Sequence, residues 1–353
     1  MPSFSTVVYY RFATRAARWL SRKLYDVRVD ERSRAALERV DPDATVIFVM
    51  NHRSNMDYVL ITYLVAENSA LSYAVGEWAR VWPLSRLIRS MGAYFIRRRS
   101  RGALYRKVLA RYVQMATTGG VTQAFYPEGG LSLTGALQPP KVGLLSYVVE
   151  GFDPEGERDI IFVPVAINYD RILEDRVLIA AGERGDRRFG ARITVVVGFV
   201  LRKIWRRMRG RDTRFGTAAV TFGDPLSLRR TGKDVPVSDL SEMLMDRIAQ
   251  AMPVLTVPLI ARVMLQAKGP LSEAELLAKV AATLEQMPLR NRVPKPDVLP
   301  DRVARATARL KKRGVISEDA QGLQIAAGQE PVLAFYANSI AHFPSEDAAP
   351  AAQ

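Results

Sequence analysis

Residues 51–58 (NHRSNMDY) place a histidine and a carboxylate five positions apart, directly after a short apolar run. The run Thr45–Met50 (TVIFVM) predicts a buried strand, and ligands of α/β sheets bind beyond the carboxyl ends of strands. A carboxylate at Asp57 can fix the tautomer of His52 and stabilise the imidazolium that forms on proton abstraction. The pair therefore suits activation of a substrate hydroxyl. The alternative is a loop histidine, with Asp57 as the N-cap of the next helix.

Two arginines, Arg97 and Arg98, close a second apolar run at residues 94–96. A guanidinium offers a planar fork of donors that binds phosphate through two parallel hydrogen bonds. For these arginines alone, with Arg99 beside them, we would favour a solvated basic edge. Because they directly follow the residues GAYFI at 92–96, we favour phosphate binding.

Residues 126–130 (YPEGG) end a third apolar run in a turn. Gly129 and its neighbour Gly130 allow backbone N–H groups to approach a ligand closely. Glu128 suits an orienting or hydrogen-bonding role better than that of a nucleophile. Lys141 follows two prolines and either adds positive charge to the same phosphate site or is a solvated lysine.

Apolar runs that alternate with helical patterns predict an α/β fold with a mixed sheet flanked by helices. The predicted strands are residues 45–50, 94–96, 121–126, 160–167, 193–201 and 220–222. From residue 231 the pattern is mainly helical, and Ser272 with Glu275 forms a capping-box arrangement before the helix at 273–286. A short hairpin is expected around Gly322. We divide the chain into an N-terminal amphipathic segment (1–44), an α/β domain (45–230), a C-terminal helical region (231–343) and a disordered tail (344–353).

The composition excludes several kinds of site. The 353 residues contain no cysteine and only two histidines, so thiolate metal sites, disulfides and a multi-histidine metal centre are not expected. We predict neither a metal nor a cofactor. The net charge of +15 points instead to anionic partners such as acidic lipid, phosphate-bearing substrates or nucleic acid.

No apolar window reaches the 20 or so residues that a membrane-spanning helix needs. The best candidate, residues 251–265, is short and contains two prolines and an arginine. Basic residues interrupt the N-terminus where a secretory signal would be apolar. We therefore expect a cytoplasmic protein, either soluble or bound peripherally to a membrane face.

Two basic, aromatic-containing stretches are candidates for contact with an anionic membrane surface. Residues 7–25 have helical spacing and an apolar face, which is typical either of a helix in the membrane interface or of one packed on the domain. Residues 201–215 contain seven basic residues around Trp205. This stretch either contacts anionic lipid or an acidic carrier protein, or is a solvated loop.

The motifs occur in an order that resembles the glycerol-3-phosphate acyltransferases, a branch of the glycerolipid acyltransferase superfamily. NHRSNMDY is similar to their first motif, GAYFIRR to the second, YPEGG followed by Ser132 and Gly135 to the third, and VPV at 163–165 to the fourth. FGDP at 222–225 and FYANSIAH at 335–342 resemble later segments of the same branch. Together they extend from about residue 45 to residue 343.

The resemblance implies the glycerolipid acyltransferase fold and transfer of a fatty acyl chain to the sn-1 hydroxyl of glycerol 3-phosphate. The acyl donor would be acyl-CoA or acyl carrier protein. His52 and Asp57 would form the base dyad. The residues implied to bind substrate are Arg97, Arg98, Glu128, Gly129 and Lys141. The implied location is the cytoplasmic face of the cell membrane, without a transmembrane helix.

Leu131 and Leu133 stand where the third motif of the family carries arginines associated with binding of the acceptor phosphate. An acyltransferase acting on lysophosphatidate or another lysolipid therefore remains an alternative. A catalytically inactive membrane scaffold is another. A basic winged helix at 273–325, with positive charge at residues 311–313, is the alternative from the class of nucleic-acid-binding proteins, although we expect no nucleic acid as a partner.

Overall fold

The computed structural model describes residues 14–30, 40–65, 72–76, 94–96, 102–185, 214–232 and 234–344. Several predictions fall on other residues. Arg97, Arg98, the expected strand at 193–201 and most of the basic stretch and of the tail lie outside the described residues.

A mixed sheet forms the centre of the molecule, with strand order β1-β7-β6-β2-β5-β3-β4, and β8 pairs with β6. Neighbouring strands run parallel except at β6, to which β7 and β8 are antiparallel. The strands are β1 (Asp26–Val29), β2 (Thr45–Met50), β3 (Ser72–Gly76), β4 (Tyr94–Ile96), β5 (Gln123–Phe125), β6 (Ile160–Tyr169), β7 (Thr217–Phe222) and β8 (Leu226–Ser227). This arrangement confirms the predicted α/β class with a mixed sheet.

Strand β2, which precedes the candidate site, lies between β5 and β6 and is parallel to both. Its six residues are apolar or β-branched, and all but Val46 are buried. Such a strand is stable only when both faces of the sheet are covered. Its carboxyl end is therefore held in a rigid part of the core.

Strand β6 contains a proline, Pro164, although it lies inside the sheet. On the side away from β2, β6 pairs with β8 at Ile161 and Phe162 and with β7 from Val165 onward. Pro164 falls between these two pairings, where a missing N–H interrupts no ladder. Its carbonyl accepts a hydrogen bond of 2.8 Å from the N–H of Gly223 in the loop that joins β7 to β8.

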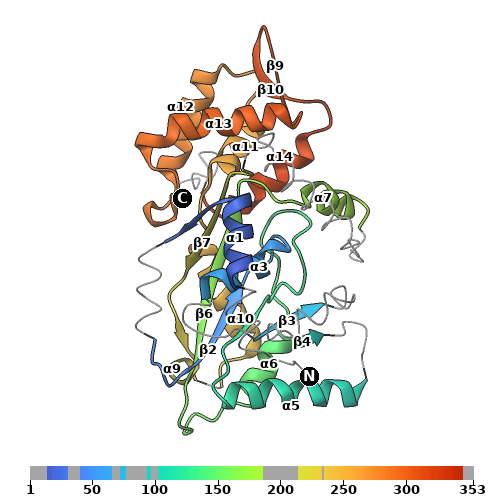
Figure 1. Ribbon diagram of the computed structural model, residues 1–353, viewed down its shortest axis with the longest axis vertical. Helices are drawn as coiled ribbons and strands as arrows, with labels where there is room; N and C mark the ends of the chain where they lie inside the picture. The colour runs from blue at the N-terminus through green and yellow to red at the C-terminus, as the bar shows by residue number, and fades with distance from the viewer. Residues whose placement is uncertain are drawn as a thin grey trace, which may run out of the picture.

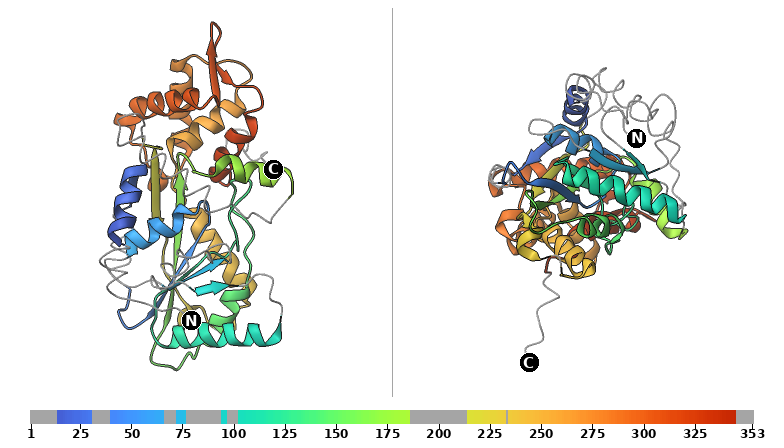
Figure 2. Two further views of the ribbon diagram at one scale, coloured as in Figure 1. Left: turned by 45° about the vertical axis from the view of Figure 1, so that its right-hand side comes forward. Right: turned by 90° about the horizontal axis from the view of Figure 1, so that it is seen from below.

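Helices cover both faces of the sheet, with α1 and α3 on one side of the strands and α10 on the other (Figure 2). Helix α5 lies across the end of the molecule opposite the C-terminal helices (Figure 1). The helices of this part are α1 (Thr14–Leu24), α3 (Met56–Val65), α5 (Ala103–Thr118), α6 (Gly143–Glu150), α7 (Asp175–Glu183) and α9 (Leu228–Thr231).

The C-terminal region is mainly helical, as predicted. It comprises α10 (Val237–Gln250), α11 (Thr256–Gln266), α12 (Glu273–Gln286), α13 (Leu299–Lys312), α14 (Glu330–Ala337), short 3₁₀ turns and a hairpin of β9 (Ile316–Asp319) and β10 (Gly322–Ile325). The capping box at Ser272 and Glu275 is present, with both reciprocal hydrogen bonds. Helix α11 is almost entirely buried and packs against α12, α13 and α14.

The N-terminal part departs from expectation at β1, which the sequence patterns did not predict. β1 pairs in parallel with β7, so the sheet takes a strand from before residue 45. Helix α1 packs on α3 through a small-residue face that includes Ala17 and Ser21, while Trp19 remains 48% exposed. The division of the chain into domains stays a prediction.

Candidate active site

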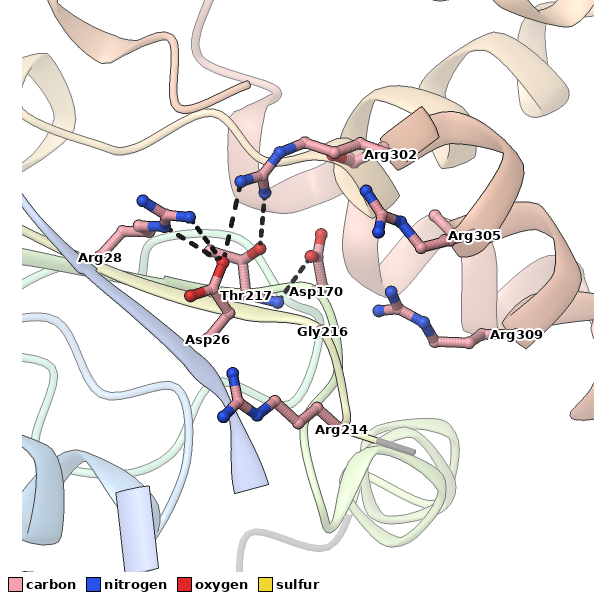
Figure 3. A pocket seen from close by; sticks show the side chains of 11 residues that line it. Asp26, Arg28, Asp170, Arg214, Gly216, Thr217, Arg302, Arg305 and Arg309 are labelled. Atoms are coloured by element: carbon pink, nitrogen blue, oxygen red, sulfur yellow. Dashed lines mark hydrogen bonds and ion pairs between the residues drawn. The ribbon is translucent and has the colours of Figure 1, made fainter. Parts of the chain in front are cut away.

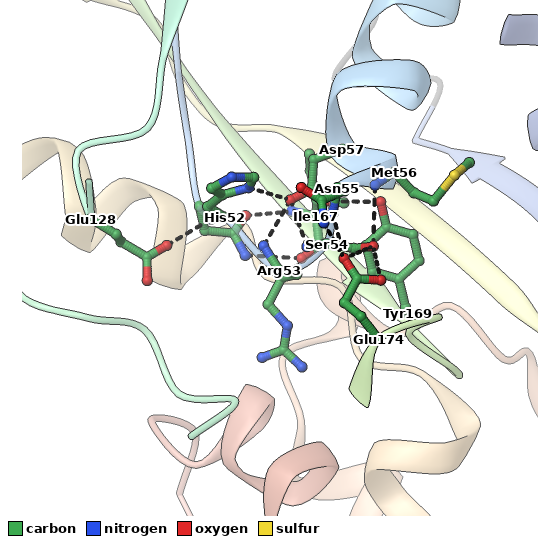
Figure 4. A network of polar contacts seen from close by, with 11 residues as sticks. His52, Arg53, Ser54, Asn55, Met56, Asp57, Glu128, Ile167, Tyr169 and Glu174 are labelled. Atoms are coloured by element: carbon green, nitrogen blue, oxygen red, sulfur yellow. Dashed lines mark hydrogen bonds and ion pairs between the residues drawn. The ribbon is translucent and has the colours of Figure 1, made fainter. Parts of the chain in front are cut away.

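The loop between β2 and α3 carries the histidine and the carboxylate singled out by their spacing. Asn51 fixes the start of the loop, because its side chain donates to the carbonyl of Ile167 at 3.0 Å and accepts from the N–H of the same residue at 2.8 Å. These bonds extend the pairing of β2 with β6 past the end of β2. His52 Nδ1 lies 2.9 Å from Asp57 Oδ2, and both side chains are buried (Figure 4).

Asp57 receives hydrogen bonds from four groups. Its Oδ2 accepts from the N–H groups of Arg53 and Ser54 at 2.7 and 2.9 Å, in addition to His52. Its Oδ1 accepts from the hydroxyl of Tyr169 at 2.6 Å, from the last residue of β6. These hydrogen bonds fix the position of the carboxylate, which in turn orients the imidazole. Asp57 lies inside α3, in its first turn, and is therefore not the N-cap of this helix.

The imidazole of His52 packs against two tyrosines, which also contact each other. It stacks on Tyr126 with ring centroids 4.0 Å apart and meets the ring of Tyr58 edge-on at 5.3 Å. Nδ1 is occupied by Asp57, and among the described residues nothing hydrogen-bonds Nε2. With the Nδ1–H directed at the carboxylate, Nε2 is the basic nitrogen. The geometry therefore suits abstraction of a proton from a hydroxyl.

Glu128 acts as a clamp between loops rather than as a nucleophile. Its Oε1 accepts from the N–H of His52 at 2.8 Å, and its Oε2 accepts from the N–H of Gln138 at 3.0 Å. Burial raises the pKa of Glu128 to about 7, against the opposing effect of these two backbone N–H groups. Of the roles suggested by the sequence, orientation is the one that this geometry supports.

Ser132 of the third motif also joins the histidine loop. Its N–H donates to the carbonyl of His52 at 3.0 Å, and its hydroxyl donates to the carbonyl of Ala136 while accepting from the N–H of Gly135. The first and third motifs are thus connected directly through the backbone of His52.

Arg53, next to the histidine, is fully buried and points away from Asp57 toward α14 (Figure 4). Its Nη1 donates to the carbonyl of Gly135, and its guanidinium carbon lies 5.4 Å from the ring centroid of Phe335. Nε and Nη2 have no hydrogen-bond partner among the described residues. Burial lowers the pKa of Arg53. Arg53 therefore links the first motif, the third motif and the C-terminal region.

Several residues of the network were missed by sequence reasoning. Glu174, just before α7, accepts from the side chain of Ser54 at 3.1 Å and from the N–H of Asn55 at 2.7 Å. Burial raises the pKa of Glu174. Glu174 and Tyr169 are more than 110 positions from the loop in the chain, and only their place at the end of β6 offered a signal.

The segment 335–342 forms hydrogen bonds with residues near the start of α7 and with the third motif. The hydroxyl of Tyr336 donates to Asp175 Oδ2 at 2.6 Å and accepts from the N–H of Ile172 at 3.1 Å. The side chain of Asn338 donates to the carbonyl of Thr134 in the third motif at 2.9 Å. The C-terminal helices therefore buttress the loops that hold His52.

The residues expected to bind phosphate are only partly described. Gly129 has φ of +67°, and its N–H donates to the carbonyl of Tyr126, so this N–H is used by the turn and not offered to a ligand. Lys141 is exposed and its side chain passes over Gly129. Leu131 and Leu133 pack against the hydrophobic core. The positions of Arg97 and Arg98 lie outside the described residues.

Among the described residues, no three His, Cys, Asp or Glu side chains are grouped so that they could hold a metal ion. Within the same part of the chain, no helix is both long and apolar enough to cross a membrane.

Two family models match this chain. Residues 27–168 match the family model "Acyltransferase", and residues 201–352 match "Glycerol-3-phosphate acyltransferase C-terminal region". The chain belongs to the glycerol-3-phosphate acyltransferase family.

Curated relatives are similar over most of this chain. A Mycobacterium tuberculosis (strain H37Rv) protein provisionally named acyltransferase plsB1 is 30% identical over 92% of this chain and 54% of its own length. The glycerol-3-phosphate acyltransferases of Haemophilus influenzae (strain PittEE) and Pseudoalteromonas translucida are each 28% identical over 94% of this chain and 43% of their own lengths. The chain therefore spans about half the length of the curated relatives it matches.

Among solved structures, the crystal structure of the 1-acyl-sn-glycerophosphate (LPA) acyltransferase PlsC from Thermotoga maritima is similar. The TM-score is 0.42 at 20% identity, over 68% of this chain and 75% of that one.

Proposed function

We propose that the protein transfers a fatty acyl chain from acyl-CoA or acyl carrier protein to the sn-1 hydroxyl of glycerol 3-phosphate, a step of phospholipid biosynthesis. The observation that carries the proposal is the His52–Asp57 pair, with the carboxylate fixed by three further donors. Relatives named glycerol-3-phosphate acyltransferase support the choice of acceptor. No cofactor takes part.

In the proposed reaction, His52 Nε2 takes the proton of the acceptor hydroxyl while its oxygen attacks the thioester carbonyl. Collapse of the tetrahedral intermediate breaks the carbon–sulfur bond, and the thiolate receives the proton from the imidazolium. Asp57 stays ionised throughout and stabilises the imidazolium. Proton transfer of this kind typically contributes about 10²–10⁴ in rate.

The acceptor phosphate would be bound by Arg97, Arg98 and Lys141, because leucines occupy the positions of the third-motif arginines. Those leucines also keep the second candidate open, an acyltransferase acting on lysophosphatidate or another lysolipid. Purified protein, incubated with labelled acyl-CoA or acyl carrier protein and a panel of acceptors, separates the two. Labelled lysophosphatidate formed from glycerol 3-phosphate supports the proposal. Exclusive acylation of a lysolipid would overturn the acceptor assignment.

We propose peripheral binding to the anionic cytoplasmic face of the cell membrane. The exposed Trp19 on the basic helix α1 supports this, since aromatic and basic residues together are typical of membrane interfaces. We expect no nucleic acid as a partner, because Lys311 forms an ion pair with Glu318 and Arg313 is buried against Asp175. The basic residues that suggested a winged helix are thus largely engaged within the protein.

A further inference from the structure

A second polar region lies at the carboxyl end of β6, away from His52. It is a cavity of about 330 Å³ between the sheet edge and helix α13 (Figure 3). Its charged lining consists of Asp26, Asp170, Arg28, Arg214, Arg302, Arg305 and Arg309. Five arginines against two aspartates leave a formal excess of three positive charges. We call this cavity the arginine pocket.

The two aspartates do not neutralise all of these arginines. Asp26 pairs with Arg28 at 3.1 Å and with Arg302 at 3.7 Å. Asp170 instead accepts from backbone N–H groups, those of Thr217 at 2.8 Å and Val257 at 2.9 Å. Asp170 is therefore committed to joining the sheet to α11.

Three arginines remain. Arg305 makes an ion pair with Asp301 at 3.6 Å, in which both side chains are more than 60% exposed, so that the pair is weak. Arg214 and Arg309 have neither a hydrogen bond nor an ion pair among the described residues, and Figure 3 shows both reaching toward the cavity.

The backbone is shaped to let these groups approach. Residues 302, 305 and 309 share one face of α13, because residues three and four apart are neighbours on a helix. Gly216 has φ of +114°, and a Cβ there would lie 2.6 Å from Asp170 Cβ and 2.8 Å from Arg309 Nη1. Any larger residue there would force Asp170 or Arg309 to shift.

We propose that the arginine pocket binds a phosphate group, and that this phosphate is not the acceptor phosphate of the proposed reaction. Several guanidinium groups around one cavity, two of them unpaired, match a ligand with more than one negative charge and several acceptor oxygens. The ligand supplies the counter-charge that the protein does not supply itself.

Three aromatic rings in contact connect the dyad with the pocket. Tyr169, which donates to Asp57, has its ring centroid 5.3 Å from that of Tyr25, and Tyr25 lies 5.7 Å from Phe215. Phe215 stands between Arg214 and Gly216. A phosphate bound here would therefore sit at the same end of the sheet as the reaction. Two sources have the required chemistry, the headgroup of an anionic phospholipid and the phosphates of a soluble donor.

The test measures binding and not turnover, so that it does not depend on the proposed reaction. Pyrophosphate affinity is determined by calorimetry for the full chain, for Arg309→Gln and for Arg214→Gln. We expect each substitution to weaken binding about tenfold, and salt to weaken the remainder. Arg290→Gln, an exposed arginine outside the pocket, serves as the matched control that retains the wild-type affinity.

Equal affinity in the wild type and both pocket variants would overturn the proposal. The source is distinguished by two further probes. The first probe is vesicles of phosphatidylcholine with phosphatidic acid. If the wild type binds them more strongly than Arg309→Gln does, the phosphate belongs to a lipid headgroup. The second probe is free CoA. If the wild type binds CoA more tightly than Arg309→Gln does, the phosphate belongs to a soluble donor. If the pocket variants bind an acidic carrier protein more weakly than the wild type but bind pyrophosphate equally well, the pocket is a protein-docking surface and the phosphate assignment is wrong.

Discussion

The His52–Asp57 pair and the arginine pocket lie at the same end of the sheet, but the protein surrounds the carboxylate of the pair with donors and leaves two arginines of the pocket without a counter-charge. Both oxygens of Asp57 are occupied, and the surrounding loops are tied together by Glu128 and Glu174. In the pocket, Arg214 and Arg309 have no partner among the described residues. A group that must hold one geometry through a reaction is saturated by the protein, whereas a group that binds a charged ligand is left incomplete.

This difference has a measurable consequence. Substitutions in the saturated loop remove partners from buried polar groups, which costs stability as well as activity. Substitution of either unpaired arginine of the pocket, Arg214 or Arg309, removes a charge that its neighbours repel, so it should cost binding alone. The predictions below test this contrast.

The largest effect is expected for His52→Ala. It removes the proposed base, so kcat for acyl transfer should fall by about 10³–10⁴. Initial rates at saturating substrates measure this. His342→Ala, at the other histidine, is the control and should retain activity, because His342 contacts the carbonyl of Ala249 and not the dyad. Turnover of a folded His52→Ala protein at near the wild-type rate would remove the base assignment.

Asp57→Asn should lower kcat by a smaller factor, about 10²–10³, because the base is still present but is no longer held in the correct orientation. An amide offers one acceptor oxygen where the carboxylate serves four donors, so Tm should also fall. The loss is expected to be about 1–3 kcal/mol in the free energy of unfolding. Kinetics and thermal denaturation on the same preparation test both parts. A variant that loses activity with unchanged Tm would show that the network around Asp57 is not structural.

The raised pKa of Glu128 predicts that the stability of the protein depends on pH. Its pKa is about 7 in the folded protein and 4.5 ordinarily, so the folded state binds the proton more tightly than the unfolded chain. The free energy of unfolding should therefore fall as pH rises from about 4.5 to about 7, by at most about 3 kcal/mol.

Glu128→Gln, which does not titrate, should lack this decline. The comparison uses urea denaturation of both proteins at about pH 5 and about pH 8. Glu285→Gln, at an exposed position, is the control and should follow the wild type. If the difference in stability between wild type and Glu128→Gln is the same at both pH values, the raised pKa is wrong.

Much of the fold was predictable because the sheet is made of short, strongly apolar runs. Thr45–Met50 and the helix Glu273–Gln286 lie where their patterns place them. β1 was missed because its sequence, DVRV, is short and half polar, and only pairing with β7 makes it a strand. Tertiary contacts decide such segments, and local propensity does not.

The site was predictable only where its residues are close in the chain. His52 and Asp57 are five positions apart, and their spacing indicated the dyad. Tyr169 and Glu174 reach Asp57 and Ser54 through the parallel pairing of β2 with β6, which no local pattern encodes. The arginine pocket was missed although a signal exists, since residues 302, 305 and 309 follow helical spacing. The other arginines of the pocket, Arg28 and Arg214, are far from these residues in the chain, and only the fold brings them together.

The smallest effect is expected at Arg309, and there its sign matters. In the absence of ligand, Arg309→Gln should leave the free energy of unfolding unchanged or raise it by a few tenths of a kcal/mol, because it removes one unpaired charge from a like-charged cluster. High salt should abolish any gain, since it screens the repulsion. Pyrophosphate should reverse the order, because a ligand that binds only the folded state stabilises the wild type more than the weaker-binding variant. Urea denaturation with and without pyrophosphate measures both states, with Arg290→Gln as the control. A ligand-free variant clearly less stable than the wild type would show that Arg309 is held by the protein, and the contrast between the two regions would fail.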